Sequence, residues 1–363
     1  MRTLLVAGGT GGHLYPALAL AEHLEKRDGP CLILSTARPV DRTVAAASTV
    51  EWITVDLHQF TPVWHWLSPR YTIHQILAMR QIWSVIRRRR PDVVVGFGGY
   101  VGAAGVAAAR LAGLPAVVHE QNLLPGRANR WLARLADAVA VSFPETRSHL
   151  SRRSPVEVTG NPVRSHLVGV GFEEARRSFG FDLERPVLLV MGGSQGSRAV
   201  NAASAGIWED QPPEVRRKVQ IIHLAGSSQE ASSLEEAYRR LGITARVFPF
   251  LHEIHLALAA ATLSISRAGA TAIAEMAALK LPAVLIPYPY AGGHQRANAR
   301  WMEAIGAAVV LEEDQITPQR LWEEVSGLLW APDRLGRMRE ALRSEGDGSA
   351  ADRLSSLVRR VAS

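Results

Sequence analysis

Residues Leu263–Asn298 read LSISRAGATAIAEMAALKLPAVLIPYPYAGGHQRAN. The apolar segment Ala261–Ser266 predicts a buried strand, and Arg267–Thr271 places a glycine where a helix of small residues would begin. A second apolar strand at Pro282–Pro287 leads through a loop of Pro, Tyr and Gly to a new helix start at His294-Gln295. This order of strand, glycine turn, helix and strand is typical of a parallel sheet that binds a ligand at the carboxyl ends of its strands.

The helix that begins after Gly269 predicts a polar ligand. The N–H groups of its first turn have no carbonyl partner within the helix, which favours an anionic or hydroxyl-rich group. Glu275, in the opening turns, could accept hydrogen bonds from a ribose diol, and Gln295 and His294 could reach sugar hydroxyls. A structural alternative is that Glu275 only complements the helix dipole.

Three other strands are also followed by glycine turns. The strands are expected at Arg2–Ala7, Asp92–Gly96 and Val187–Met191, and their turns read GGTGGH (8–13), FGGY (97–100) and GGSQGS (192–197). The first turn lacks the dinucleotide fingerprint, because Leu14 stands where the third glycine would be, and no P-loop is present. The glycines could simply make a tight turn with no ligand. His13 is less easily explained that way, since it lies inside the turn.

The length and the repeated pattern predict two domains. A chain of 363 residues is long for one core. Strands and helices alternate up to the Gly/Asn/Pro turn at Gly160–Arg164 and then start again. We therefore expect an α/β protein with two Rossmann-like, doubly wound parallel-sheet domains facing a cleft, over residues 1–163 and 164–342. The C-terminal helical segment 343–363 is expected to pack back on the first domain.

Composition narrows the possible partners. With 47% hydrophobic and 21% charged residues the chain reads as a globular protein, and its net charge of +7 suggests nucleotide phosphates, nucleic acid or anionic lipid. Nucleic acid is not expected, because zinc-ligand spacing, a basic zipper and aromatic RNA-binding signatures are all missing. Cys31 is the only cysteine, so no internal disulfide is possible, which fits a reducing compartment. No signal peptide or apolar run near the roughly 18 residues of a spanning helix is found, so a cytosolic or membrane-surface protein is expected.

Aromatic and basic residues alternate over residues 58–90. Ile73–Arg90 has helical periodicity with one apolar face, and we interpret it as an amphipathic helix packed on the sheet with a solvated basic end. Phe60–Leu67 contains two tryptophans and is expected to be an exposed aromatic loop that contacts a membrane or a lipid substrate.

Seven motifs, in this order, resemble the MurG family, the bacterial UDP-N-acetylglucosamine transferases that convert lipid I to lipid II in peptidoglycan synthesis. They are GGTGGH, FGGY, HEQN, TGNPVR, GGSQGS, RAGATAIAE and HQRANA, and the match runs from the first strand to about residue 340. The resemblance implies the glycosyltransferase-B architecture, with the donor held mainly by the second domain and the lipid acceptor by the first. It also implies a peripheral protein on the cytoplasmic face of the bacterial membrane, with an anionic membrane surface as partner.

The resemblance also implies roles for matching residues. Asn122 should contact the donor sugar, Arg164 and Ser194 the diphosphate, Leu251 the uracil through its backbone, and Gln295 the N-acetylglucosamine hydroxyls. The full set of expected substrate-binding residues is Thr10, Gly11, Gly12, Tyr100, Asn122, Arg164, Ser194, Gln195, Leu251, Ala270, Thr271, Ala272, Ile273, Ala274, Glu275, His294 and Gln295.

The expected chemistry is a single displacement with inversion, which needs a base for the incoming C4 hydroxyl and stabilisation of the leaving diphosphate. His13 is the candidate base, because an imidazole titrates near neutral pH; alternatively it hydrogen-bonds the donor. Glu120 is the second candidate, or a residue that orients its neighbours. No Asp-x-Asp motif is present, so neither a metal nor another cofactor is expected.

Two departures from the family pattern leave alternatives open. Thr271-Ala272 stands where the family often has Leu-Thr, which moves a hydroxyl by one residue, and Phe60–Leu67 replaces a loop of basic residues and glycines. Three alternatives to the implied function remain: a transferase of the same architecture with another lipid acceptor such as diacylglycerol, a UDP-sugar epimerase, and a catalytically silent regulator that binds a UDP-sugar.

Overall fold

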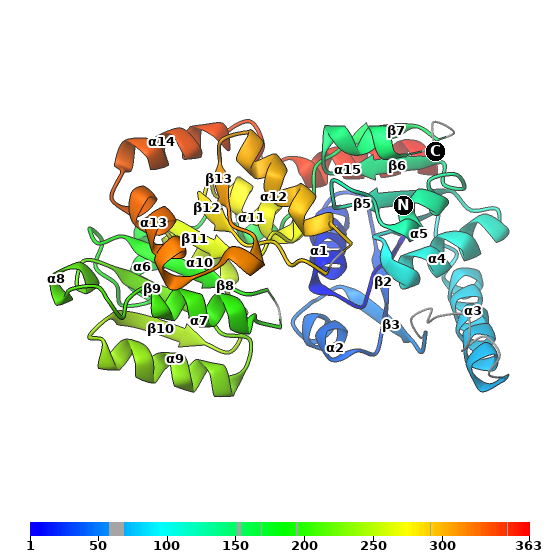
Figure 1. Cartoon of the computed structure of the whole chain (residues 1–363). Helices are drawn as coiled ribbons and strands as arrows, with labels where there is room; N and C mark the ends of the chain where they lie inside the picture. The colour runs from blue at the N-terminus through cyan, green and yellow to red at the C-terminus, as the bar shows by residue number, and fades with distance from the viewer. Residues whose placement is uncertain (58–68, 151–153, 168, 194, 291, 347) are drawn as a thin grey trace. The chain divides into compact units, whose positions relative to one another are not determined.

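The computed structural model spans Met1–Ser363, and the structure describes all residues except 58–68, 151–153, 168, 194, 291 and 347. The chain divides into two compact units (Figure 1). Unit 1 consists of Met1–Ser165 and Gly348–Ser363, and unit 2 is His166–Asp347. Each unit has its own parallel sheet.

Within the described residues, unit 1 contains a seven-stranded sheet in the order β3-β2-β1-β4-β5-β6-β7, with every neighbouring pair parallel. The strands are β1 (Thr3–Val6), β2 (Cys31–Thr36), β3 (Glu51–Val55), β4 (Val93–Gly96), β5 (Ala116–Glu120), β6 (Ala138–Val141) and β7 (Val156–Val158). Most are apolar runs because helices cover both faces of the sheet. The order of the strands reverses between β1 and β4, which is the topological switch point of the sheet.

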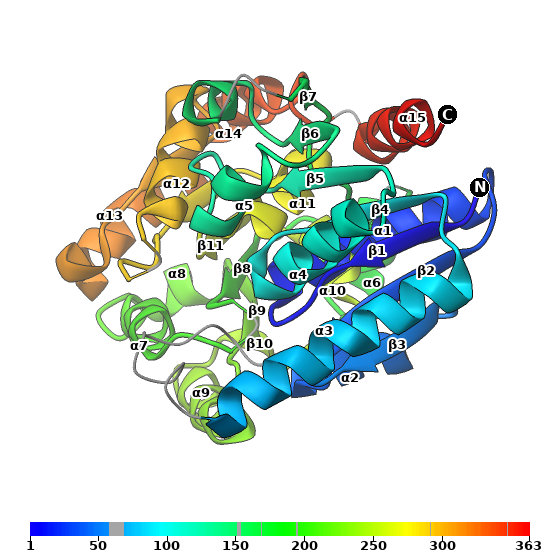
Figure 2. The same ribbon diagram turned by 90° about the vertical axis from the view of Figure 1, so that its right-hand side faces the viewer.

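Helices form a layer on each face of this sheet. One apolar cluster joins the sheet to α3 (Pro69–Arg89), α4 (Gly99–Leu111) and the end of α5 (Arg127–Leu132). Figure 2 shows α3 and α4 side by side. The second cluster joins the sheet to α1 (Gly11–Glu25), α2 (Pro39–Ala46) and α15 (Ala350–Ala362).

Helix α15 brings the end of the chain back to unit 1. Leu354, Leu357 and Val358 are buried in the cluster that α15 shares with α1. Arg353 Nε donates a hydrogen bond to the Thr159 carbonyl at 2.9 Å. Ion pairs to Asp28 and Glu157 lie at the rim of the contact, where solvent reduces their contribution. The buried leucines therefore supply most of the attachment.

Unit 2 repeats the design. Its described residues include a six-stranded parallel sheet in the order β10-β9-β8-β11-β12-β13, with the switch point between β8 and β11. The strands are β8 (Val187–Met191), β9 (Gln220–Leu224), β10 (Thr244–Phe248), β11 (Leu263–Ser266), β12 (Ala283–Leu285) and β13 (Ala308–Val310).

On one face of the unit 2 sheet, helices pack around two buried aromatic residues. Trp208 and Tyr238 lie in a cluster with α7 (Arg198–Gly206), α9 (Ser228–Arg240), α13 (Pro318–Leu329) and α14 (Pro332–Ala341). The cluster contains no residue of α11 (Ala270–Ala278) or α12 (His294–Ala304), which fits the opposite face expected for right-handed connections beyond the switch point. The other described helices of unit 2 are α6 (Phe172–Ser178), α8 (Pro213–Arg216), α10 (Ile254–Ala260) and η4 (Glu313–Gln315). The short helix η2 (Pro144–His149) belongs to unit 1, and η3 (Ser165–Leu167) spans the boundary between the units.

Two expectations from the sequence concerned contact with a membrane: the absence of a spanning helix and the aromatic and basic residues of segment 58–90. Across the described parts of the chain, no helix is both long and apolar enough to cross a bilayer. The aromatic segment Phe60–Leu67 lies outside the described residues, whereas Ile73–Arg89 belongs to α3 as the periodicity predicted.

Candidate active site

The glycine turns lie at the switch points of the two sheets. In unit 1 the turn 8–13 follows β1 and the turn 97–100 follows β4, and β1 and β4 are neighbours. In unit 2 the turn 192–197 follows β8 and the turn 267–270 follows β11, which are also neighbours. Ligands of doubly wound sheets bind at this position, outside the carboxyl ends of the strands. Each unit therefore has one candidate site.

A buried aspartate on α2 holds the first turn of unit 1 in place. Gly9 has a φ of +85°, a conformation that suits glycine, and its N–H donates to the Asp41 carboxylate at 3.1 Å. The same carboxylate accepts hydrogen bonds from the backbone N–H (3.1 Å) and the hydroxyl of Thr36. Thr10 precedes α1 in extended conformation, and α1 begins at Gly11. Asp41 thus fixes the turn to the end of β2.

His13 lies between the two glycine turns of unit 1. Its ring packs against the second turn so closely that a Cβ on Gly98 would be 3.3 Å from His13 Nε2. Thr10 Oγ1 and His13 Nδ1 are 3.1 Å apart. Burial lowers the pKa of His13 below 6.5, while the negative charges of Glu120 and Asp41 oppose that shift. The imidazole is therefore neutral at pH 7 and can accept a proton.

Glu120 is only 2% exposed, and its carboxylate organises the loop that follows β5. Its oxygens accept hydrogen bonds from Asn122 N (2.9 Å), Asn122 Nδ2 (3.2 Å), Gly126 N (3.0 Å) and Asn129 Nδ2 (2.8 Å). With four donors already bound, the carboxylate is poorly placed to accept a proton from substrate. It orients Asn122 and acts on His13 through its charge.

The other members of the HEQN motif serve the fold. Burial lowers the pKa of His119 to about 4, and its Nε2 lies 3.0 Å from the Gly160 carbonyl. Gln121 donates to the carbonyl of Phe97 at 3.1 Å, which ties the end of β5 to the second glycine turn. Asn122 is the half-buried member of the motif that can face a ligand.

Tyr100 and Arg164 line the same end of unit 1. The guanidinium of Arg38 lies over the Tyr100 ring, 5.6 Å from its centroid, and Arg164 lies 4.5 Å from the centroid of Tyr15 on α1. The sequence analysis placed Arg164 at the start of the second domain, whereas the compact unit that includes it is unit 1.

The first turn of unit 2 depends on close backbone contact between two loops. A Cβ on Gly196 would lie 2.4 Å from the Ala225 carbonyl oxygen, and one on Gly226 would lie 2.3 Å from Gly196 Cα. Ser197 caps α7 by accepting a hydrogen bond from Val200 N at 3.4 Å. Gln195 is exposed at the tip of this turn, and Ser194 lies outside the described residues.

Arg267 links the two turns of unit 2 and was not singled out by the sequence analysis. Its Nη2 donates to Ser197 Oγ at 2.7 Å and pairs with Glu313, and its Nη1 donates to the Ile286 carbonyl at 3.1 Å. A single guanidinium thus connects the ends of β8, β11 and β12. The only sequence signal was an arginine directly after a buried strand.

Helix α11 and the start of α12 hold the remaining predicted residues. Ala270 begins α11, and Glu275 lies in its second turn, 8% exposed. The Gln295 Oε1 atom accepts hydrogen bonds from Ala268 N (3.2 Å) and Tyr288 N (3.0 Å), so this side chain also positions the turn after β11. The other residues expected here are Thr271, Ala272, Ile273, Ala274 and His294, and Leu251 lies in the loop between β10 and α10.

Metal ligands do not cluster in the part of the chain that the structure describes: no group of three or more His, Cys, Asp or Glu side chains is placed to hold an ion. The glycine turns, helix starts and arginines of these two sites instead suit a ligand with phosphates and hydroxyls.

Known proteins share both the sequence and the fold. Residues 3–141 match the glycosyltransferase family 28 N-terminal domain, and residues 187–354 match the family 28 C-terminal domain. Relatives from Caldanaerobacter subterraneus subsp. tengcongensis and Desulforudis audaxviator are 33% and 37% identical. The match covers 99% and 100% of this chain and 100% and 99% of those relatives. Both are named UDP-N-acetylglucosamine–N-acetylmuramyl-(pentapeptide) pyrophosphoryl-undecaprenol N-acetylglucosamine transferase.

Solved structures agree with this assignment. The crystal structure of Acinetobacter baumannii MurG superposes with a TM-score of 0.74 at 27% identity, covering 99% of both chains. A UDP-GlcNAc 2-epimerase from Neisseria meningitidis, at 15% identity and a TM-score of 0.70 (99% of this chain, 100% of that chain), shares the fold. Two doubly wound units with family 28 matches at both ends define a glycosyltransferase of the two-domain class. Within that class, the chain belongs to the MurG family.

Proposed function

We propose that this protein transfers N-acetylglucosamine from UDP-N-acetylglucosamine to the C4 hydroxyl of the N-acetylmuramoyl unit of lipid I, forming lipid II for peptidoglycan. The observation that carries this proposal is the pair of glycine-lined switch points, one in each unit, in a chain that matches its family over its whole length. The cleft predicted between the domains stays a prediction.

Unit 2 would bind the donor. The amino end of α11 offers N–H groups to a phosphate, and Glu275 would bind the ribose. Leu251 would contact the uracil through its backbone, and Ser194 and Gln195 would lie at the diphosphate. Gln295 would use its amide nitrogen toward the sugar, since its oxygen already holds the turn after β11. The remaining residues proposed to surround the donor are Ala270, Thr271, Ala272, Ile273, Ala274 and His294.

Unit 1 would bind the acceptor and supply the base. His13 is neutral at pH 7, and the glycines at Gly98 and Gly99 place no side chain against its ring. Thr10, Gly11, Gly12 and Tyr100 would line this acceptor side. We assign Glu120 a positioning role: it orients Asn122 toward the donor sugar and stabilises the imidazolium that forms when His13 takes the proton.

The departing UDP would be stabilised by fixed positive groups. Arg164 is buried against Tyr15, so its position is fixed before substrate binds, and the helix starts after β8 and β11 add N–H donors. Preorganised donors of this kind contribute about 2.7–4 kcal/mol each to transition-state stabilisation. In this mechanism the C4 oxygen attacks the anomeric carbon as UDP leaves, so a β-linked product forms with inversion.

An anionic membrane surface on the cytoplasmic side is the proposed partner of unit 1. Ile73, Ile76 and Leu77 on α3 are each more than half exposed, and the same helix ends in the run Arg87–Arg90. The exposed Arg80 lies one helical turn from Ile76 and Leu77, and the run Arg87–Arg90 lies further along, at the end of α3. Aliphatic groups and arginines exposed on one helix suit binding at the headgroup level. Vesicle sedimentation tests this proposal, because the protein should pellet with vesicles that contain anionic lipid. Equal pelleting with neutral vesicles would show that the arginines do not contribute to membrane binding.

One assay separates the proposed function from its alternatives. Purified protein is incubated with UDP-N-acetylglucosamine and either lipid I or diacylglycerol, and UDP release and the glycolipid product are measured. Lipid II formed only with lipid I supports the proposal. Transfer to diacylglycerol would indicate another lipid acceptor, epimerised UDP-sugar would indicate an epimerase, and binding without any turnover would indicate a regulator.

A further inference from the structure

A cavity of about 940 Å³ lies in unit 2, away from the candidate donor site. Its lining includes Pro186, Thr262 and Leu281, which come directly before or close to the starts of β8, β11 and β12. The donor site lies where these strands end. Because β8 has five residues and a strand rises about 3.3 Å per residue, the two sites are roughly 16 Å apart along the sheet.

One wall of the cavity holds an arginine that is fully used by the fold. Arg176 on α6 donates to the carbonyls of Ala260 (3.1 Å) and Arg185 (2.8 Å) and to the Thr262 hydroxyl (2.9 Å). Its guanidinium also lies 3.9 Å from the ring centroid of Phe172. Arg176 is therefore a fixed positive charge in the wall.

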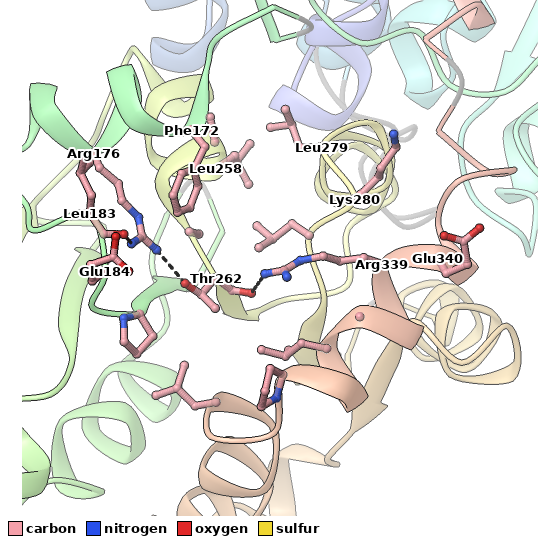
Figure 3. A pocket seen from close by; sticks show the side chains of 18 of the residues that line it. Phe172, Arg176, Leu183, Glu184, Leu258, Thr262, Leu279, Lys280, Arg339 and Glu340 are labelled. Atoms are coloured by element: carbon pink, nitrogen blue, oxygen red, sulfur yellow. Dashed lines mark hydrogen bonds between the residues drawn. The ribbon is translucent and has the colours of Figure 1, made fainter.

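Arg339 on α14 enters the same cavity from the other side (Figure 3). Its Nη2 donates to the Thr262 carbonyl at 3.4 Å. Within the described residues the guanidinium of Arg339 makes no other hydrogen bond and no ion pair. Two guanidinium groups thus approach one threonine from opposite sides. Burial lowers the pKa of both arginines. At Arg176 the carboxylates of Asp182 and Glu184 oppose this shift, and the charge of Arg339 is a smaller contribution that adds to it. At Arg339 burial is the only cause, so an anion bound in the cavity would pair with Arg339.

The rest of the lining is mainly apolar, and its other charged residues are Glu184 near Arg176, Lys280 after α11, and Glu340 and Arg343. Leu258 and Phe172 line the side of the cavity near Arg176, and Leu279 lies between Leu258 and Lys280 (Figure 3). Leu335 and Trp330 come from the segment around α14. The carboxylate of Glu340 is engaged by Arg343 at 2.7 Å, so it does not neutralise Arg339. A ligand that fits must carry both an anionic group and an apolar body.

We propose that this cavity binds an organic anion with an apolar body, a phosphate monoester or carboxylate that pairs with Arg339 while its hydrocarbon part lies against Leu258 and Leu279. Guanidinium groups bind both kinds of anion through paired N–H donors. This site lies at the opposite end of the sheet from the proposed donor site and does not depend on the proposed function.

The test uses octyl phosphate as the probe and isothermal titration of the full-length protein with UDP present in excess, so that the proposed donor site is filled. Octyl phosphate should bind the unmodified protein, and Arg339→Gln should weaken binding about tenfold or more, as expected for the loss of a charge-assisted pair. Arg337→Gln is the matched control, because Arg337 lies on the same helix and is exposed like Arg339, but does not line the cavity. It should bind like the unmodified protein.

Three further probes test separately how the anionic group and the apolar body of the ligand contribute to binding. Octanoate should bind through the same arginine, whereas inorganic phosphate lacks the apolar body and octanol lacks the charge, so both should bind at least tenfold more weakly. Equal binding of octyl phosphate to the Arg339→Gln and Arg337→Gln proteins would overturn the proposal. The absence of saturable binding at millimolar concentration, or inorganic phosphate binding as tightly as octyl phosphate, would do the same.

Discussion

His13 shows how a single side chain acquires a chemical role from its surroundings. It is attached to the first glycine turn, packs on the second, and experiences the charges of Glu120 and Asp41. Burial keeps it neutral, and the carboxylates favour the protonated form once a proton arrives. A base in such an environment can both accept the acceptor's proton and tolerate the resulting charge.

Replacement of this side chain should slow the chemical step. We expect His13→Asn to lower kcat by about 10²- to 10⁴-fold, the usual contribution of a general base, with little change in UDP affinity. His23→Asn is the matched control, because His23 lies on the same helix and contacts Asp352 of α15 rather than the site. Steady-state kinetics and a UDP titration check both variants. Loss of UDP binding in His13→Asn would instead make His13 a donor ligand.

The pH dependence of the reaction follows from the same residue. The pKa of His13 is lowered from 6.5 by burial, so the neutral, active form persists below pH 6.5 and is lost only as pH falls through the lowered value. The acidic limb of kcat/KM against pH should therefore have its midpoint below 6.5. A midpoint above 6.5 would show that another group titrates.

At the scale of secondary structure elements, the glycine turns could be predicted from the sequence, but the side chains that hold these turns in place could not. Glycines directly after apolar strands are local signals, so the sequence predicted the turns around Gly9, Gly98 and Gly196 at the places where the structure has them. The supports are distant in sequence. Asp41 holds Gly9 from 32 residues away, and Arg267 reaches Ser197 across 70 residues. No periodicity or spacing reports such a contact, and these supports were not predicted.

Glu120 illustrates the same limit within a predicted motif. Its place beside His13 was predicted, but the choice between base and orienting residue depends on how many donors surround its carboxylate. Those donors include Asn129, which lies on the next helix. The structure favours the orienting role, because the hydrogen bonds of the carboxylate are already made within the loop.

Gly196, in the first turn of unit 2, and Gly242, after α9, make a matched pair of sites for glycine variants. Gly196 and Gly242 have nearly the same positive φ, +72° and +70°, but only Gly196 has backbone atoms close to the position of a Cβ. Both Gly→Ala changes strain the backbone, and Gly196→Ala adds overpacking, so it should reduce the free energy of unfolding by about 1–3 kcal/mol more than Gly242→Ala. Urea denaturation measures both. Equal losses would mean that the loop after β9 moves aside at little cost.

At the scale of the whole molecule, the chain does not divide at one point. From the sequence we expect the end of the chain to pack on the first domain, and the second segment of unit 1 begins at Gly348. The sequence predicted a C-terminal helical segment over residues 343–363, and α15 is part of it. The partner of α15, α1, lies more than 300 residues earlier and could not be read from the local sequence.

The apolar contact of α15, more than its ion pairs, should stabilise unit 1. Leu357 is 2% exposed, so Leu357→Ala should lower the free energy of unfolding by about 2–5 kcal/mol through cavity formation. Arg360→Ala removes a largely exposed pair with Glu157 and should cost about 0–1 kcal/mol. Calorimetry of the two variants provides the comparison. A larger loss for Arg360→Ala would reverse this ranking.

The return of α15 has a consequence for synthesis of the protein. The ribosome makes β1 to β7 first, then all of unit 2, and α15 only afterwards. Until that helix emerges, the part of α1 that it covers stays exposed to water and to other nascent chains. Unit 2 can complete its core earlier, although its residues are translated later than most of unit 1. Maturation of the nascent polypeptide should therefore run opposite to the order of translation.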